Sequence, residues 1–470
     1  MQPVLFIVIP LLMAFVSINL KKSHAKYLLI LVGLFNALGT LFVDKGVYLI
    51  GGFAKEYSIS LVLDDYSLIA IQVINIAFIF LILISLNKLN KMATVVMISM
   101  AGLNGLLLTN DLFNLFVFLE VSSIAAYILT TQSKDYKATF NYLVLGVFGS
   151  SLYLLGIVLI YKMVGFLEFG KVAELTKSGN YLVPLLLIFG GFAVEAKLLP
   201  FSGWVRDILK GANEFTSVLI ASIYAGTMMF VLGRLLMVFN VEGSLMTVLI
   251  VIGLITMILG EIAAYSADNL KEVLAYSSIG QAGLVFLLLL SNFYTLAIML
   301  IIGNVVVKFL LFNFAARLET DQLSKLQGIF VKNKIVGVSV TMAFLSLLGV
   351  PFFYGFIVKL NLLMNLMLMN QFILVIAILF VAVVEAGYII KMLVAFWNPG
   401  EEGETPSMKF ESKVNFNSTI AFKYAAVLIA LGLLTLGIMP KYLYDYTDGQ
   451  NDEIVNQYPI ILIDEIGGSK

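Results

Sequence analysis

Apolar runs of about 20 residues recur along almost the entire chain and restrict its fold more than any other feature. A helix needs about 20 mostly apolar residues to cross the hydrocarbon core of a bilayer. Backbone polar groups find no partners in lipid, so such segments are expected to be helical. The sequence therefore predicts an all-α polytopic membrane protein with about 14 transmembrane helices. The expected spans are approximately residues 3–20, 26–43, 66–87, 93–110, 112–132, 138–161, 181–210, 215–240, 244–264, 270–291, 293–317, 335–370, 371–397 and 420–440.

The composition agrees with a membrane protein and argues against several other classes. Hydrophobic residues make up 61% of the 470 residues, charged residues only 12%, and 29 basic residues balance 29 acidic ones. A net charge of zero gives no sign of a nucleic-acid surface. The chain has no cysteine and one histidine, His24, which removes thiolate iron–sulfur ligation, nearly all haem or zinc ligation and the usual nucleophilic sets. We therefore expect no cofactor, no metal, no catalytic site and no nucleic-acid partner.

The distribution of basic residues predicts the orientation in the membrane. Lysine and arginine in short loops stay on the cytoplasmic side. Most of them lie in or beside the odd-numbered loops between the expected spans, for example Lys21, Lys88 and Lys332. Both termini of this multi-pass protein are therefore expected on the extracytoplasmic side of the cell (cytoplasmic) membrane.

The segment FGGFAVEAKLLPFSGW, residues 189–204, places a glutamate, a lysine and a proline inside an apolar span. A charge at the centre of a bilayer costs roughly 2.5–3.5 kcal/mol, so Glu195 and Lys197 must face a polar cavity, a partner charge or the end of the apolar slab. Pro200 removes a backbone donor and breaks or kinks the helix. Broken helices at membrane depth are tolerated only where they line protein or water. This segment predicts an ion-conducting cavity at residues 195–204.

A second interrupted span follows about 150 residues later. Residues 349–359 read GVPFFYGFIVK, so a proline, Pro351, again lies beside a lysine, Lys359. Paired interrupted spans in corresponding halves indicate an inverted-repeat transporter with its ion path at the junction of the repeats. Lys359 is interpreted as functional, although its long stem also allows it to reach the membrane surface.

Glu120 is surrounded by apolar residues in DLFNLFVFLEVSSIAAYIL. Loss of hydration favours the protonated form of a carboxyl group, so a glutamate there can gain and lose a proton unless a base lies near. Lys197, on another helix, is its natural partner, and such a coupled pair works as a switch. A purely structural ion pair is the alternative. Lys308 lies in the middle of its helix, and we interpret it as functional rather than structural because of the cost of burial.

A further group of polar residues is accessory. Glu195 lies beside Lys197, whereas Glu385 and Lys391 share a helix at a spacing of six that puts them on different faces. A relay exit and a plain structural role are equally open for that pair. Tyr127 and Asn304 are suited to hold water between titratable groups, although isolated polar residues in helices more often form packing bonds.

Five segments of the chain, in order, resemble signature segments of the antiporter-like subunits of respiratory complex I, Mrp-type cation/proton antiporters and membrane-bound hydrogenases. They read DLFNLFVFLEVSSIAAYIL, AVEAKLLPFSGWVRD, LKEVLAYSSIGQAGLV, NVVVKFLLF and GVPFFYGFIVK. The resemblance implies two inverted five-helix repeats with interrupted helices near Pro200 and Pro351, and a buried Glu–Lys pair that feeds a central lysine and histidine axis. It identifies Glu120 with the family's glutamate, Lys308 with its central lysine, and Lys359 with the residue beside the second break.

The sequence departs from the family pattern at three positions. Glu195 stands where the family usually has its lysine, and the lysine here is Lys197. Gly226 replaces a lysine or histidine of the following helix, and Asn304 replaces a histidine. A shift of two residues turns a helical side chain by about 200°, so Lys197 is expected to reach Glu120 only through the local break. Water would have to fill the gap at residue 226.

These observations divide the chain into expected segments. The N-terminal helices occupy residues 1–92, with an extramembrane hairpin at 46–63 that is indicated by two glycines between β-branched runs. The remaining segments are a first inverted repeat at 93–240, a second at 244–397, a polar loop at 398–419, a last helix at 420–440 and a soluble tail at 441–470.

The leading hypothesis is an ion-translocating subunit, for H⁺, Na⁺ or both, in a multi-subunit redox-driven pump of the membrane-bound hydrogenase or complex I type. The expected partners are other membrane subunits, among them another antiporter-like chain and redox subunits, and the lipid bilayer. Two alternatives stay open: a subunit of a Mrp-type Na⁺/H⁺ antiporter, and a structural or coupling subunit whose relay has degenerated. A stand-alone transporter of an organic solute is less favoured, because it needs a substrate-sized polar pocket.

Overall fold

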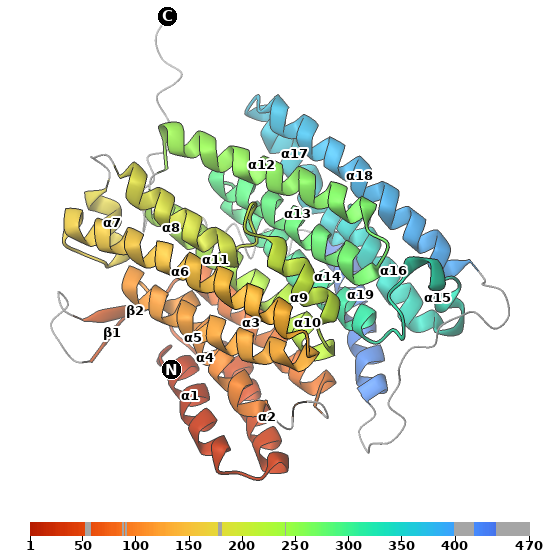
Figure 1. Ribbon diagram of the computed structural model, residues 1–470, viewed down its shortest axis with the longest axis horizontal. Coiled ribbons are helices and arrows are strands. Elements are labelled where there is room, and N and C mark those ends of the chain that lie inside the picture. Colours follow the sequence, from red (N-terminus) through yellow and green to blue (C-terminus); the bar gives the residue numbers. More distant parts are fainter. Residues whose placement is uncertain are drawn as a thin grey trace, which may run out of the picture.

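The computed structural model describes residues 1–51, 58–86, 89, 92–176, 181–239, 241–398 and 418–438. Long helices lie side by side in one bundle, with the N-terminal helices at its lower edge and α18 at its upper right (Figure 1). The elements of the first half are α1 (Leu5–Ile18), α2 (Lys22–Gly39), β1 (Gly46–Ile50), β2 (Ile59–Leu63), α3 (Asp65–Ile84), α4 (Ala93–Leu108), α5 (Leu112–Thr130), η1 (Thr131–Ser133), α6 (Tyr136–Val164), α7 (Phe169–Leu175), α8 (Leu182–Glu195), α9 (Gly203–Gly211), α10 (Glu214–Val218), the π-helical turn η2 (Leu219–Tyr224) and α11 (Ala225–Val238).

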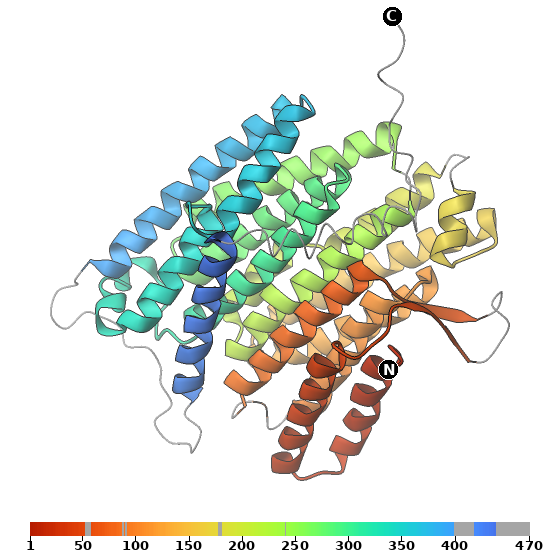
Figure 2. The same cartoon turned by 180° about the vertical axis from the view of Figure 1, so that it is seen from behind.

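The second half is also helical. Its elements are α12 (Gly243–Ser266), α13 (Leu270–Leu290), α14 (Tyr294–Ala316), η3 (Leu323–Lys325), α15 (Ile329–Lys332), α16 (Lys334–Leu348), α17 (Tyr354–Leu368), α18 (Phe372–Trp397) and α19 (Ser418–Ile438). The last of these, α19, packs against α16 and α17 (Figure 2). The core is made of buried apolar side chains that run continuously from α1 to α19.

Within the described residues, nine helices are long and apolar enough to cross a membrane. Five further apolar helices, α1, α4, α8, α16 and α17, are shorter. The sequence-based expectation of a polytopic helical membrane protein is therefore confirmed, whereas the count of about 14 spans stays a prediction. Most of the expected polar loop at 398–419, namely residues 399–417, and the whole expected tail at 441–470 lie outside the described residues.

The only described strands, β1 and β2, pair antiparallel, with Gly46 opposite Leu63. They lie in the segment where the sequence indicated a hairpin, although the residues that connect them lie outside the described ranges. β2 leads directly into α3, whose N-terminus is capped by Asp64 through a hydrogen bond from the backbone N–H of Ser67 at 2.8 Å. The same carboxylate forms a bidentate pair with Arg234 of α11, at 2.5 and 2.7 Å. This buried pair ties the hairpin and α3 to the end of α11.

Both proline-containing segments interrupt their spans. α8 ends at Glu195 and α9 begins at Gly203, with Pro200 between them. α16 ends at Leu348 and α17 begins at Tyr354, with Pro351 between them. Each expected span of 181–210 and 335–370 is therefore two helices in the structure, and each break exposes helix-end carbonyls inside the bundle.

Two helix pairs approach each other closely at glycines. A Cβ on Gly191 of α8 would lie 2.4 Å from the carbonyl oxygen of Gly149 on α6. A Cβ on Gly260 of α12 would lie 2.4 Å from the backbone nitrogen of Gly280 on α13. Small residues at membrane helix contacts let two backbones come together in this way. The close approach lets Tyr142 of α6 contact Glu195 of α8, and it brings Glu261 of α12 against Gly280 of α13.

Gly191→Ala tests the close approach of α6 and α8. The added methyl group meets backbone atoms, which cannot move aside, so we expect a loss of about 1–3 kcal/mol in the free energy of unfolding. Gly190→Ala is the matched control, because a Cβ there meets nothing within 4 Å. The measurement is the thermal unfolding midpoint of the purified protein in detergent. Equal midpoints for the two variants would contradict the packing argument.

Candidate ion-translocation site

Glu195 ends α8 and is held by hydroxyl groups of the two preceding long helices. Its side chain is 6% exposed and accepts hydrogen bonds from Ser123 of α5 at 3.1 Å and from Tyr142 of α6 at 3.2 Å. The ring of Tyr142 stacks on Trp204 and meets Tyr127 edge-on, with centroid distances of 3.9 and 4.8 Å. Within the described residues no basic side chain forms an ion pair with Glu195. The carboxyl group is therefore stabilised by polar neutral partners, which suit either of its protonation states.

Lys197 leaves the path of α8 inside the break. Its φ of +61° lies in the left-handed region, which is uncommon for residues other than glycine. The side chain is 2% exposed, and its Nζ donates to the carbonyl oxygen of Ile220 in η2 and to Ser278 Oγ of α13, both at 3.4 Å. The break thus directs this ammonium group toward η2 and α13.

Glu120 lies half-buried on α5 and forms no hydrogen bond or ion pair with any described residue. Electrostatic interactions link it with Glu195 and Tyr127. The direct ion pair of Glu120 with Lys197 that the sequence predicted is not formed, because Lys197 points to η2 and α13. The carboxylate of the interrupted segment itself, Glu195, occupies the buried position instead.

A cavity of about 30 Å³ separates Lys197 of the first interrupted span from Lys308 of α14. Since one water needs roughly 10–15 Å³, it has room for about two water molecules. Its lining combines the two lysines with small and polar residues, which are Ala221, Ser222, Ala225, Gly226, Met229, Ser278, Gln281, Ala282, Val285, Ile301, Asn304 and Val305. Of residues 195–204, where an ion-conducting cavity was expected, only Lys197 lines this cavity.

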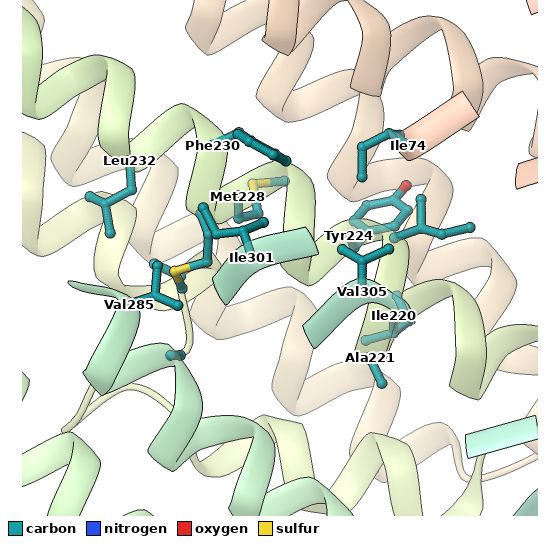
Figure 3. Close-up of a cluster of buried hydrophobic side chains, with 14 of the residues drawn as sticks. Ile74, Ile220, Ala221, Tyr224, Met228, Phe230, Leu232, Val285, Ile301 and Val305 are labelled. Atoms are coloured by element: carbon teal, nitrogen blue, oxygen red, sulfur yellow. The ribbon is translucent and has the colours of Figure 1, made fainter. Parts of the chain in front are cut away.

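The wall formed by η2 and α14 is tightly packed. Figure 3 shows the apolar side chains there, with Ala221 and Val305 on facing elements. Ser222 Oγ donates to the carbonyl oxygen of Val305 at 2.7 Å. A Cβ on Gly226 would lie 2.4 Å from Val305 Cγ2, so this position accepts no larger residue without a change in α14. The lysine or histidine expected from the family pattern at residue 226 is excluded here by shape.

Lys308 faces a second polar group on its other side. Its side chain is 1% exposed, and its Nζ donates to Ser277 Oγ of α13 at 2.9 Å. Glu261 of α12 is fully buried and accepts a hydrogen bond from the hydroxyl of Tyr388 on α18 at 2.8 Å. Coulombic interactions connect Glu261 with Lys308 and with the next carboxylate, Glu385. Glu261 was not predicted as a site residue, although a lone glutamate in the apolar run MILGEIAAY was a usable signal.

Lys359 and Glu385 form the far end of this polar row. Their Nζ and Oε2 atoms lie 2.5 Å apart, and Glu385 is 1% exposed. Lys359 also donates to the carbonyl oxygens of Leu347 and Leu348 at 2.8 and 3.3 Å, which are the last carbonyls of α16 before the break. Gln281 Nε2 donates to the other carboxylate oxygen of Glu385 at 3.2 Å. Gln281 therefore connects the central cavity with this end of the row.

The other residues predicted as accessory have different places. Asn304 is half-buried and lines the cavity. Tyr127 packs against Tyr142 beside Glu195. Lys391 is exposed on α18, away from the buried Glu385 of the same helix. Taken together, titratable groups extend from α8 through α12 and α14 to α17 and α18, and α13 contributes the hydroxyl and amide groups beside them.

Comparison with known proteins assigns the family. The family model described as NADH:quinone oxidoreductase/Mrp antiporter, TM, matches residues 109–384. The chain belongs to this family. Relatives include a subunit of the Na⁺/H⁺ antiporter of Alkalihalophilus pseudofirmus, 28% identical over 78% of this chain and 76% of that protein. A subunit of the NADH-quinone oxidoreductase of Francisella tularensis is 26% identical over 71% of this chain and 72% of that protein.

The fold is also found in solved membrane complexes. A chain of the membrane-bound sulfane sulfur reductase, an archaeal respiratory membrane complex, superposes with a TM-score of 0.88 at 27% identity, over 96% of this chain and 97% of that chain. The protein is therefore an antiporter-like membrane subunit of the class that occurs in Mrp and complex I-type assemblies. The resemblance noted in the five sequence segments is confirmed.

Because Lys359 and Glu385 form a buried ion pair, removal of one charge should destabilise the protein more than removal of both. Lys359→Met leaves a buried carboxylate without its cation, and such losses cost about 3–5 kcal/mol. Lys359→Met combined with Glu385→Gln removes both charges and should be clearly more stable than Lys359→Met alone. The thermal unfolding midpoints of the two variants and the wild type give the comparison. A double variant that is less stable than the single one would contradict a direct pair.

Gly226→Ala should destabilise the protein by about 1–3 kcal/mol, because the new methyl group collides with Val305. Val305→Ala removes the methyl group it would meet. The double variant Gly226→Ala/Val305→Ala is therefore expected to unfold at a higher temperature than Gly226→Ala alone, as measured in detergent. If Val305→Ala does not restore the unfolding midpoint of Gly226→Ala, a clash between residues 226 and 305 is not the cause of the destabilisation.

Proposed function

We propose that this chain translocates H⁺, Na⁺ or both as a subunit of a multi-subunit complex in the cell membrane. The observation that carries the proposal is the row of buried titratable groups across the bundle. In order, these are Glu195, Lys197, Lys308, Glu261, Glu385 and Lys359, of which all but Lys359 are at most 6% exposed. Buried ionisable residues in membrane helices are costly and usually mark ion pathways.

The geometry supports a relay with a central electrostatic coupling. Lys197 and Lys308 line one small cavity and interact electrostatically. Two ammonium groups in one cavity repel each other, so a proton on one lysine favours release of a proton from the other. Since the cavity has room for about two waters, water supplies the contact that Gly226 does not. In this mechanism the proton passes from Lys197 to Lys308, or back, through water in the cavity, and the helices do not have to move apart.

Glu120 enters the relay from its periphery. It is half-buried and lies three residues before Ser123, on the same face of α5. Ser123 in turn donates to Glu195. We assign to Glu120 the exchange of protons with the exterior of the chain, and to Glu195 the role of the buried carboxylate next to Lys197. The buried Glu–Lys unit of the proposed relay therefore consists of Glu195 and Lys197, with Glu120 feeding it.

A redox-driven pump of the membrane-bound hydrogenase or complex I type is the proposed setting. The likeness to the archaeal respiratory complex covers 96% of this chain at 27% identity, which favours this setting. The proposed partners are other membrane subunits, including another antiporter-like chain and redox subunits, and this chain itself carries no cofactor. We also propose about 14 spans in two inverted five-helix repeats, and both termini on the extracytoplasmic side.

Two other functions have observations in their favour. The relative named as a Na⁺/H⁺ antiporter subunit favours a Mrp-type exchanger. The missing contact between Glu120 and Lys197, together with Gly226 in the cavity wall, favours a structural or coupling subunit with a degenerate relay.

Mass spectrometry of the intact complex, purified through a tag on this chain from native membranes, separates the settings. Co-purified iron–sulfur subunits support a redox-driven pump. A second antiporter-like chain with only small hydrophobic partners supports an exchanger driven by an existing gradient.

Lys197→Ala and Lys308→Ala should each abolish translocation, because each removes one of the two protonatable groups at the cavity. Glu120→Gln should abolish coupled transport but leave assembly intact. The assay is proton flux into vesicles that contain the purified complex and an internal pH dye, driven by its electron donor or by an imposed Na⁺ gradient. Lys162→Ala, at an exposed position on α6, is the control. Normal flux in Lys197→Ala and Lys308→Ala would support the structural alternative.

A further inference from the structure

Four buried polar side chains, each from a different helix, lead from Lys308 to Glu261. Lys308 Nζ donates to Ser277 Oγ at 2.9 Å. Ser277 is also an electrostatic neighbour of the Tyr388 hydroxyl, although no hydrogen bond is formed between these two side chains in this structure. The Tyr388 hydroxyl then donates to Glu261 Oε2 at 2.8 Å. The connection therefore joins α14, α13, α18 and α12 inside the bundle, and all four side chains are buried.

The two hydrogen bonds of this row have the same polarity. An ammonium group can only donate, and an ionised carboxylate can only accept. A hydroxyl group can do both. Ser277 accepts from Lys308 and so keeps its own proton to offer toward Tyr388, which donates to Glu261. Both of these bonds point from the lysine end to the glutamate end of the row.

The surroundings of Glu261 suit a group that changes its protonation state. The charged and titratable groups that interact with it are Lys308 on α14, Lys359 on α17, and Glu385 and Tyr388 on α18. Lys359 is engaged in its own pair with Glu385 at 2.5 Å. Glu261 Oε1 is buried and has no hydrogen-bond partner among the described residues. Lys308 is therefore the cation whose charge Glu261 balances, through the hydroxyl groups rather than by direct contact.

The absence of a side chain at Gly280 leaves room for the carboxyl group of Glu261. A Cβ on Gly280 of α13 would lie 2.5 Å from Glu261 Oε1, so a side chain there would displace the carboxyl group. The same close approach of α12 and α13 at Gly260 brings Glu261 beside α13, which also carries Ser277. The glycine contact thus positions the acceptor end of the connection.

We propose that Lys308, Ser277, Tyr388 and Glu261 form a proton wire, with Glu261 as a proton-carrying residue of the second half. This inference rests on the proposed function and adds the route by which a proton leaves the central lysine. In one transfer, Lys308 gives a proton to Ser277, Ser277 gives its own to Tyr388, and Tyr388 gives its own to Glu261. The lysine and the glutamate both end neutral, and each hydroxyl group keeps one proton.

The transfer replaces two buried charges with two neutral groups. Desolvation of an ion pair in a low-dielectric interior offsets much of its Coulombic attraction, so the charged and neutral forms of such a pair are close in free energy. Small changes in nearby charge can then drive the proton in either direction. The alternative contact from the cavity, through Gln281 to Glu385, passes through an amide N–H, which donates a hydrogen bond but is not a titratable carrier.

Infrared difference spectroscopy of the purified complex tests the wire without requiring ion flux. A protonated carboxyl group has a C=O absorption that a carboxylate and an amide lack. We expect a carboxyl band that appears after a jump to lower pH and is lost in Glu261→Gln. Glu272→Gln is the control, because Glu272 pairs instead with the partly exposed Arg206 and Lys210. Glu261→Asp keeps a carboxyl group and should retain a band at a shifted pH midpoint.

The rate at which this band appears tests the two hydroxyl groups. Tyr388→Phe and Ser277→Ala should each slow it roughly 100-fold, the lower range for a positioned proton donor. Tyr153→Phe removes another buried hydroxyl, which donates to the carbonyl oxygen of Leu112 at 3.3 Å, and should leave the rate unchanged.

A band that persists in Glu261→Gln, or equal rates in Tyr388→Phe and Tyr153→Phe, would overturn the wire. Normal vesicle flux in Lys197→Ala and Lys308→Ala, with this band and its rates as expected, would count against the proposed function and leave the wire supported.

Discussion

The cost of placing charge inside an apolar helix bundle governs this structure. Each buried lysine and most buried carboxylates have polar contacts from another helix, because an isolated charge at that depth is costly. Some pairs, such as Asp64 with Arg234, fasten helix ends in fixed bidentate geometry. The centre of the row is different, since a small cavity separates Lys197 from Lys308, and hydroxyl groups contact Lys308 and Glu261. Partners that accept either protonation state are what a moving charge requires.

The helix breaks make this row possible. In an unbroken helix all backbone groups inside are paired, and lysines project at fixed angles. At the first break the left-handed backbone of Lys197 turns its side chain toward η2 and α13. At the second break Lys359 reaches the free carbonyls at the end of α16 and the carboxylate of Glu385 together. Both breaks therefore supply the contacts that stabilise a lysine in the middle of the bundle.

The apolar runs and the two prolines were sufficient to predict a helical membrane protein, and interruptions occur beside Pro200 and Pro351 in the structure. Lys197, Lys308 and Glu385 stood out because charge is rare in apolar spans, and all three are buried. The predicted pair of Glu120 and Lys197 is absent, because the left-handed backbone of Lys197 turns its side chain toward η2 and α13. Glu261 was overlooked because it lies near the end of the apolar segment that forms α12. Its partners come only from the packing of α12 on α13 and α18.

The sequence by itself determined the environment of the chain and the family segments it carries, because hydropathy and local motifs are properties of neighbouring residues. Tertiary structure alone decided which charges meet. Ser277, Tyr388 and Glu261 lie on three different helices, and their contacts depend on helix rotation and on close approach at Gly260 and Gly280. Such contacts depend on the distance between two helix backbones. The spacing of residues along the sequence gives no information on that distance.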